Sequence, residues 1–149
     1  MQIRPAVPSD GPAIADLLIR QAPHMEVKGY PHGRWPEGIM VLVAVEEDHL
    51  VGWVEGVLDG AYTGPGSPTP PPHGYVLGVV VDPAWRRMGA GRALLDSFVS
   101  VASDEAVRWV FLFPEEGEDV AGRVAFLRAA GFEPVDDPTE TTPAMGRWT

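Results

Sequence analysis

The stretch VVVDPAWRRMGAGRALL, residues 79–95, joins a run of branched apolar residues to a pattern typical of an amphipathic helix. The apolar run, which begins at Tyr75, predicts a buried β-strand that ends at Asp82-Pro83. Two adjacent arginines and a Gly-x-Gly turn follow, and apolar residues then recur at helical spacing until about Ala102. We therefore predict a strand, a glycine turn and a helix from Gly89, with a negatively charged group bound at the turn.

The chemistry of this turn favours phosphate. The first backbone amides of a helix have no partner within the helix, and they lie at the positive end of its dipole. Glycine at positions 89 and 91 lets a ligand come within hydrogen-bond distance of the backbone. Arg86, Arg87 and Arg92 can add charge-assisted hydrogen bonds. The alternative for a bare Gly-x-Gly pattern is an ordinary helix preceded by a flexible turn with solvated arginines.

Two common phosphate-binding motifs do not fit the residues present. A dinucleotide-binding turn carries a third glycine three residues after the second, where this chain has Leu94. A nucleotide-binding P-loop needs Gly-Lys followed by serine or threonine, and no lysine or suitable hydroxyl residue follows the turn. The sequence therefore disfavours the first motif and excludes the second.

The overall composition limits the partners. The chain has 149 residues, a formal net charge of −10 and no cysteine. Its acidic average field argues against nucleic acid, and the lack of cysteine excludes a thiol nucleophile, a disulfide and a thiolate metal site. No apolar run approaches the roughly 20 residues that span a bilayer, and the first residues do not resemble a signal peptide. We expect a cytoplasmic protein that does not span a membrane.

The rest of the sequence predicts one domain in which strands and helices are mixed. The first helix is expected to be capped by Ser9 or Asp10. The order of the predicted strands and helices along the chain indicates an α/β (α+β three-layer) fold with a mixed sheet, in a single domain over residues 1–149. In chain order, the predicted elements are a strand and helix over residues 3–22, a loop or broken helix over 23–38, a hairpin over 39–60, the central strand over 75–81, a helix over 89–102, a strand over 108–113, a helix over 119–130 and one or two final strands over 132–149.

The hairpin predicted over residues 39–60 turns at 46–49. Alternation in its second strand places one set of side chains on the same face, namely Val51, Trp53, Glu55 and Val57. A segment rich in proline and glycine, residues 61–74, separates this hairpin from the central strand and predicts a surface excursion. Gly78 within the central strand predicts a bulge or a close approach of another group to the backbone.

The stretch from Val79 to Arg92 resembles the cofactor-binding signature of the GNAT-type N-acetyltransferase superfamily. The matching residues are Val79-Val80-Val81-Asp82-Pro83 and then Arg86-Arg87-Met88-Gly89-Ala90-Gly91-Arg92. Residues 3–18 resemble the first strand and helix of this family, and residues 125–134 resemble a later helix that ends in Gly-Phe. The resemblance covers almost the whole chain and implies the acyl-CoA N-acyltransferase fold. In that fold, a mostly antiparallel sheet with splayed middle strands has helices on both faces.

The resemblance implies an enzyme that moves the acetyl group of acetyl-CoA to a primary amine by direct transfer, without a metal. The pyrophosphate of acetyl-CoA would lie on Arg87 to Arg92, with Arg86 at the first position of the motif. Pantetheine would lie along the backbone of Val79 to Val81, and the Val79 amide would polarise the acetyl carbonyl. The expected partners are acetyl-CoA and an amine acceptor, and a homodimer is compatible with the sequence. The alternative is a non-catalytic acyl-CoA-binding or regulatory domain.

The catalytic side chains depart from the pattern of the family. The tyrosine that protonates the leaving sulfur in many family members is replaced by Leu127, and a frequent asparagine is replaced by Val120. Glu55 is the first candidate for the general base, with an exposed strand carboxylate as the alternative. Other candidates are His73 and Asp59 as bases, Tyr30, Tyr62 and Tyr75 as sources of a hydroxyl, and Trp35 and Trp53 as walls of an acceptor pocket. A protein-interaction role for the Pro-rich residues 64–72 rests on composition alone.

Overall fold

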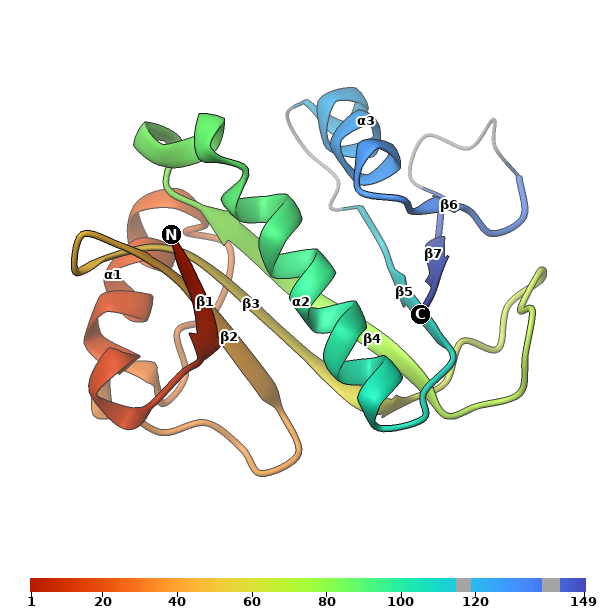
Figure 1. Ribbon diagram of the computed structural model, residues 1–149, viewed down its shortest axis with the longest axis horizontal. Helices are drawn as coiled ribbons and strands as arrows, with labels where there is room; N and C mark the ends of the chain where they lie inside the picture. Colours follow the sequence, from red (N-terminus) through yellow and green to blue (C-terminus); the bar gives the residue numbers. More distant parts are fainter. Residues whose placement is uncertain (115–118, 138–142) are drawn as a thin grey trace. The chain divides into compact units, whose positions relative to one another are not determined.

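The computed structural model describes residues 1–114, 119–137 and 143–149 (Figure 1). The strands form one mixed sheet in the order β1-β2-β3-β4-β5-β7-β6. The pairs β1–β2, β2–β3, β5–β7 and β6–β7 are antiparallel, and β4–β5 is parallel. The predicted α/β class with a mixed, mostly antiparallel sheet is therefore confirmed. In the described ranges, no helix is long and apolar enough to cross a membrane.

The strands are β1 (Gln2–Pro5), β2 (Met40–Glu46), β3 (His49–Gly60), β4 (His73–Val81), β5 (Trp109–Leu112), β6 (Glu133–Pro134) and β7 (Met145–Trp148). The α-helices are α1 (Gly11–Gln21), α2 (Ala90–Asp104) and α3 (Val120–Ala129), and the short 3₁₀ helices are η1 (Pro8–Asp10), η2 (Tyr30–His32) and η3 (Pro83–Met88). The predicted elements are all present, and most of their ends lie within two residues of the predicted ones.

The chain folds into two compact units, each built from two stretches of sequence. The N-terminal unit consists of Met1–Gly56 and Leu77–Phe98, and the C-terminal unit consists of Val57–Val76 and Val99–Thr149. The N-terminal unit thus contains the whole stretch from Val79 to Arg92.

β2 and β3 form the hairpin that the sequence predicts. Glu46 pairs with His49, and the two residues between them, Glu47 and Asp48, have φ values of 50° and 64°. Two residues in this left-handed region make a tight turn whose twist matches that of the flanking strands. The predicted turn at residues 46–49 is therefore confirmed.

The helices of the N-terminal unit cover opposite faces of its part of the sheet. A methyl group added at Gly52 of β3 would lie 2.9 Å from Leu94 Cδ1 of α2 and 3.5 Å from Ala44 Cβ, so α2 packs on that face. Side chains alternate between the two faces of a strand, and those next to Ala44 and Gly52 therefore point toward α1. The cluster between α1 and this second face includes Ile14, Leu17, Leu18, Val41, Val43 and Trp53. This unit has the predicted three layers.

The start of α1 differs from the prediction. The Asp10 carboxylate does not cap the helix; it accepts hydrogen bonds from the Arg4 guanidinium at 2.7 and 2.9 Å and from the Val7 amide at 2.8 Å. The bond from Arg4 lowers the pKa of Asp10. The Asp10 carboxylate therefore binds the Arg4 guanidinium of β1 and not the amides of α1, and Pro8–Asp10 form the 3₁₀ helix η1.

In the C-terminal unit, β5 pairs with the first residues of β4 and with β7. Gly74 and Tyr75 are the β4 residues in the parallel ladder, opposite Val110 and Phe111. β4 begins at His73, two residues before the predicted start, and the C-terminal tail forms both of the strands that the sequence allows.

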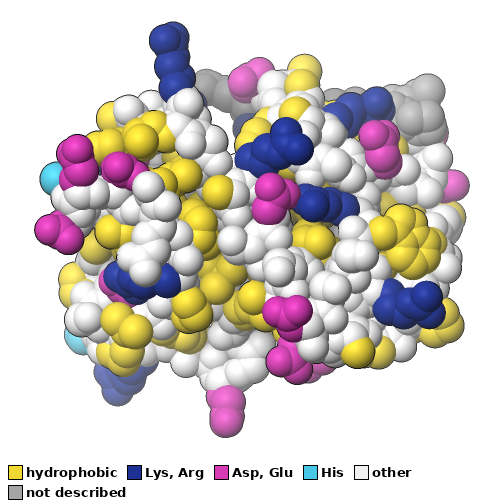
Figure 2. Space-filling view, viewed as in Figure 1, with side chains coloured by type: hydrophobic (Ala, Val, Ile, Leu, Met, Phe, Trp, Pro, Cys, Tyr) yellow, Lys and Arg dark blue, Asp and Glu magenta, His cyan; other side chains and the backbone are white. Residues whose placement is uncertain are grey.

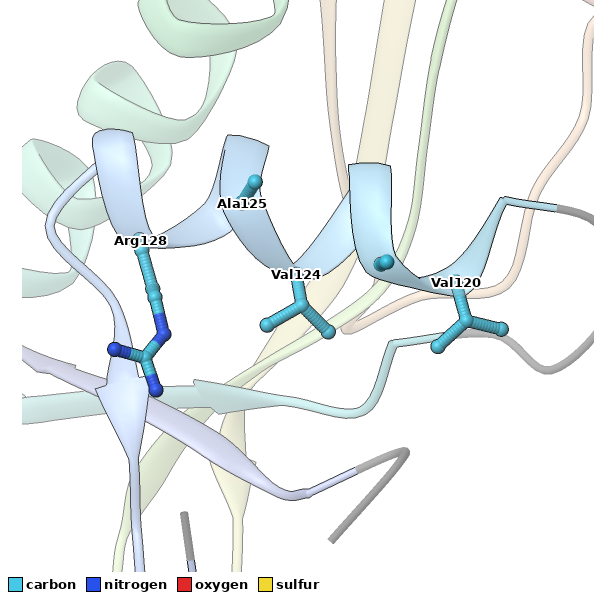
Figure 3. Close-up of a pocket in the computed structure, with 5 residues that line it drawn as sticks. Val120, Val124, Ala125 and Arg128 are labelled. Atoms are coloured by element: carbon cyan, nitrogen blue, oxygen red, sulfur yellow. The ribbon is translucent and has the colours of Figure 1, made fainter. Parts of the chain in front are cut away.

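The apolar residues of α3 differ in burial. Leu127 is buried, but Val120 and Val124 are only half-buried. Their side chains point to the same side of the helix as Arg128 (Figure 3). With Ala121 and Ala125, these residues line an apolar hollow of about 380 Å³. Apolar residues occur on several sides of α3, and Phe126 is exposed, so the spacing alone does not identify the buried side.

The contact between β5 and β7 provides a test of the fold. A methyl group at Gly146 would collide with the indole of Trp109, which is 3 % exposed and has little room to move. We expect Gly146→Ala to lower the free energy of unfolding by about 1–3 kcal/mol, measured by chemical denaturation. Trp109→Phe in the same chain should recover part of the loss, because phenylalanine lacks the second ring. Equal stability of Gly146→Ala and the wild type would contradict this packing.

Candidate functional site

The segment after β4 is anchored at its first residue. The Asp82 amide donates to the Val51 carbonyl of β3 at 2.8 Å. The Asp82 carboxylate accepts from the Ala84 amide at 3.0 Å and thereby caps η3, and it also lies 3.3 Å from the Arg20 guanidinium of α1. The backbone that leads to the arginines is thus fixed from two elements of the N-terminal unit.

Gly89 separates η3 from α2 and has a left-handed backbone. Its φ is +74°, and apart from its chain neighbours no atom of the described residues lies within 4 Å of the position that a Cβ would occupy. Glycine adopts this conformation without strain, and the absence of a side chain leaves the approach to the first turn of α2 open. The helix begins at Ala90, one residue later than predicted. Ala90 and Gly91 are buried, whereas Met88 and Gly89 are exposed.

Arg86 and Arg87 differ from Arg4 and Arg20 of the N-terminal unit, whereas Arg34 of that unit is likewise exposed and forms no ion pair with a described residue. Arg4 is paired with Asp10, and Arg20 is paired with Asp16 and Asp82. Arg86 and Arg87 are exposed and form no ion pair with any residue that the structure describes. Acidic and basic side chains are interspersed on the face drawn in Figure 2, without a continuous basic surface. Unpaired guanidinium charge beside a helix start is a local feature suited to a small anion.

The other residues of the predicted signature flank this point. Val79, Val80 and Val81 are half-buried, and Val80 packs against the α1 cluster. The guanidinium of Arg92 lies 3.9 Å from Asp96, one turn further along α2.

Glu55 lies in the same unit and is not the exposed strand carboxylate that the sequence left as the alternative. It is 8 % exposed, and its Oε2 accepts a hydrogen bond from the Tyr30 hydroxyl at 2.7 Å. The Tyr30 oxygen in turn accepts a hydrogen bond from Trp53 Nε1 at 3.0 Å. Burial, and then the bond and charge of Glu55, raise the pKa of Tyr30 well above its usual range.

Two aromatic candidates surround this hydrogen-bonded chain. The Trp35 ring lies 5.6 Å from the Tyr30 ring, and Trp53 meets Tyr30 edge-on at 6.0 Å. Trp53 exposes none of its surface, so it belongs to the core and not to the wall of an open pocket. A Cβ at Gly78 would lie 3.1 Å from the Trp53 ring and 2.6 Å from Met25 Cε, so a close approach accounts for this glycine.

Tyr30 is the residue that sequence reasoning missed as a partner of Glu55. It lies in the aperiodic segment between residues 23 and 38, and no spacing rule connects that segment to β3. The available signal was Glu55 itself, because a carboxylate within an apolar strand needs a polar partner when it is buried.

His73 is in the C-terminal unit and has a structural role. It is completely buried; its Nδ1 accepts from the Tyr62 amide at 3.0 Å, and its Nε2 lies 2.7 Å from the Thr69 carbonyl oxygen. Both ring nitrogens are therefore occupied by the Pro-rich segment, and neither is available as a base. Asp59 is exposed on β3.

The two remaining tyrosines also have local contacts in the C-terminal unit. The Tyr62 hydroxyl donates to the Pro65 carbonyl at 3.0 Å. Tyr75 stacks on Phe111, with 4.6 Å between the ring centroids.

The fold is similar to that of several solved N-acetyltransferases. An aminoglycoside antibiotic 6'-N-acetyltransferase from Acinetobacter haemolyticus has a TM-score of 0.75 and 19% identity, over 92% of this chain and 94% of that one. An aminoglycoside 6'-N-acetyltransferase complexed with coenzyme A has a TM-score of 0.68 and 15% identity, over 98% and 94%. The ribosomal-protein-S18-alanine N-acetyltransferase from Escherichia coli has a TM-score of 0.70 and 16% identity, over 99% and 92%.

Sequence comparison identifies the family. No curated protein matches the chain significantly by sequence. A family model described as the acetyltransferase (GNAT) family matches residues 12–132, which include the complete stretch from Val79 to Arg92. Because this match extends over most of the chain, the protein belongs to the acetyltransferase (GNAT) family, and its reaction is acetyl transfer.

Proposed function

We propose that the protein transfers the acetyl group of acetyl-CoA to a primary amine of a small molecule or protein, directly and without a covalent enzyme intermediate. We also propose that residues 1–149 act as a single domain. The observation that carries the proposal is the exposed, unpaired Arg86-Arg87 pair next to the open, left-handed Gly89. In a family defined by acetyl transfer, this is a place where a diphosphate fits.

The proposed acetyl-CoA site uses mainly the backbone. The amides at the start of α2 and the guanidinium groups of Arg86, Arg87 and Arg92 would bind the pyrophosphate. The backbone of Val79 to Val81 would pair with the pantetheine arm. The proposed residues are Val79, Val80, Val81, Arg86, Arg87, Met88, Gly89, Ala90, Gly91 and Arg92.

Glu55 is the proposed general base. An alkyl ammonium has a reference pKa of about 10.4 and must lose a proton before its nitrogen can attack the thioester. Oε2 of Glu55 is bound by Tyr30, whereas Oε1 forms no hydrogen bond with a described residue. Oε1 is therefore the oxygen that would take this proton. The Val79 amide would donate to the acetyl oxygen as charge develops there.

The leaving thiolate does not require a dedicated acid. Leu127 occupies the position of the usual tyrosine and is 4 % exposed, within the core. A thiol has a reference pKa near 8.5, so the thiolate is a tolerable leaving group near neutral pH.

An amine panel tests the activity. It contains an aminoglycoside with a 6'-amine, a peptide with an N-terminal alanine, a lysine-containing peptide and a short alkyl diamine. The first two correspond to acceptors named for similar structures. We expect thiol release from acetyl-CoA with at least one amine. Tight coenzyme A binding with no turnover of any amine would instead support a non-catalytic binding domain.

The double variant Arg87→Ala/Gly89→Asp tests the pyrophosphate site. It removes one charge-assisted contact, worth about 1.5–3 kcal/mol, and places a side chain with negative charge where the ligand approaches. We expect the Kd for coenzyme A, measured by calorimetry, to rise by at least about 100-fold. Arg128→Ala on α3, which also removes an exposed arginine, should leave the Kd unchanged. Wild-type affinity in a folded double variant would refute the site.

Glu55→Gln tests the base. The amide keeps the shape of the side chain but cannot take up a proton at neutral pH. We expect kcat for the best panel amine to fall about 100-fold or more, because general bases contribute roughly 10²–10⁴ in rate. The Kd for coenzyme A should not change. A kcat within twofold of the wild-type value would show that another group accepts the proton.

A further inference from the structure

We propose that Tyr30 is a positioning residue for acetyl transfer: held by Trp53, its hydroxyl binds Oε2 of Glu55 and leaves Oε1 as the proton acceptor. The hydroxyl acts through Glu55 and touches neither the acetyl group nor the amine. This inference rests on the proposed role of Glu55 as the base.

The direction of the hydrogen-bond chain follows from the donor chemistry of its first member. The indole nitrogen of tryptophan is only a donor, so the bond at 3.0 Å is donated by Trp53 to the Tyr30 oxygen. The Tyr30 proton is then free to point at Glu55, 2.7 Å away. Oε2 must therefore act as an acceptor. The two oxygens of the carboxylate thus have different roles, although they are equivalent in an isolated glutamate.

The backbone around Tyr30 keeps its hydroxyl in place. Tyr30 begins η2, its amide donates to Val27 at 3.0 Å, and its carbonyl accepts from the Gly33 amide at 2.9 Å. The Tyr30 carbonyl also packs against Gly11 at the start of α1, where any side chain would collide with it. Tyr30 is 2 % exposed. The ring is therefore fixed relative to α1, which packs on the same face of the sheet as Trp53.

Tyr30 itself keeps its proton during the reaction. Burial and the neighbouring carboxylate both oppose ionisation of the phenol and raise its pKa. The hydroxyl remains a donor to Oε2 at neutral pH, so the proton that leaves the amine has Oε1 as its acceptor. A fixed donor also prevents the carboxylate from rotating and exchanging its two oxygens.

Tyr30→Phe tests the inference. It keeps the ring in the core and removes only the hydroxyl. We expect kcat for the best panel amine to fall about 10-fold, with the KM for acetyl-CoA unchanged, since a hydrogen bond to a charged group contributes on that scale. Tyr62→Phe is the matched control: its hydroxyl donates to the Pro65 carbonyl and not to Glu55, and we expect kcat within about twofold of the wild-type value.

A double-mutant cycle separates positioning from a general structural effect. If Tyr30 acts through Glu55, Tyr30→Phe should have no further effect on kcat in a Glu55→Gln background. A full 10-fold further loss would overturn the inference. A wild-type kcat in Tyr30→Phe, together with a low kcat in Glu55→Gln, would also overturn the inference. That result would leave the proposed role of Glu55 intact. Full activity of Glu55→Gln, or no turnover of any panel amine by the wild type, would overturn the proposed base or activity and this inference with it.

A second measurement does not depend on the folding of Tyr30→Phe. The three tyrosines of the chain can be followed by ultraviolet absorbance during alkaline titration. We expect the last tyrosine to ionise at lower pH in Glu55→Gln than in the wild type, because the carboxylate no longer opposes the phenolate charge. An unchanged midpoint would show that the Tyr30 hydroxyl is not bound to this carboxylate.

Discussion

A carboxylate that is buried in an apolar strand must be hydrogen-bonded, and this constraint connects the main parts of the N-terminal unit. Glu55 lies on β3 and obtains its partner from the segment after α1, where Tyr30 reaches Oε2 at 2.7 Å. That contact requires α1 and η2 to pack closely, and Gly11 allows the approach. The interaction fixes a charge that a purely apolar strand would not contain, and it gives the two carboxylate oxygens different surroundings. The same hydrogen bond thus meets a structural requirement and, in the proposed mechanism, positions the proton acceptor.

In contrast to Glu55, the charged side chains of the segment from Arg86 to Gly89 are not buried against a partner. Its arginines are exposed and unpaired within the described residues, in a protein whose formal net charge is −10. Arg4 and Arg20 of the same unit are paired, and the nearest carboxylate before this segment, Asp82, is engaged by Arg20 and by the cap of η3. The acidic side chains therefore do not neutralise this site. Positive charge and open backbone remain available for an anionic ligand, which is what a diphosphate requires.

Local patterns predicted most of the fold, and long-range contacts account for the parts that they missed. The apolar run ending at Val81, the glycine turn and the hairpin turn at 46–49 each depend on neighbouring residues, so the sequence was sufficient. Ser9 or Asp10 was expected to cap α1, but no side chain caps this helix, and the Asp10 carboxylate is bound by Arg4 on β1. The bond between Tyr30 and Glu55 joins residues 25 positions apart, and no periodicity encodes it. The sequence also did not predict that both ring nitrogens of His73 have hydrogen-bond partners, because these partners lie in an irregular segment.

In the proposed mechanism, one unit of this acetyltransferase holds both the diphosphate site and the proton acceptor. A crystal structure with a non-hydrolysable acetyl-CoA analogue would test this arrangement. We expect a diphosphate bound by the amides that follow Arg86, an acyl oxygen facing the Val79 amide, and Oε1 of Glu55 turned toward the acyl carbon with Oε2 still on Tyr30. A diphosphate bound away from Gly89, or a Glu55 side chain turned away from the acyl group, would contradict it.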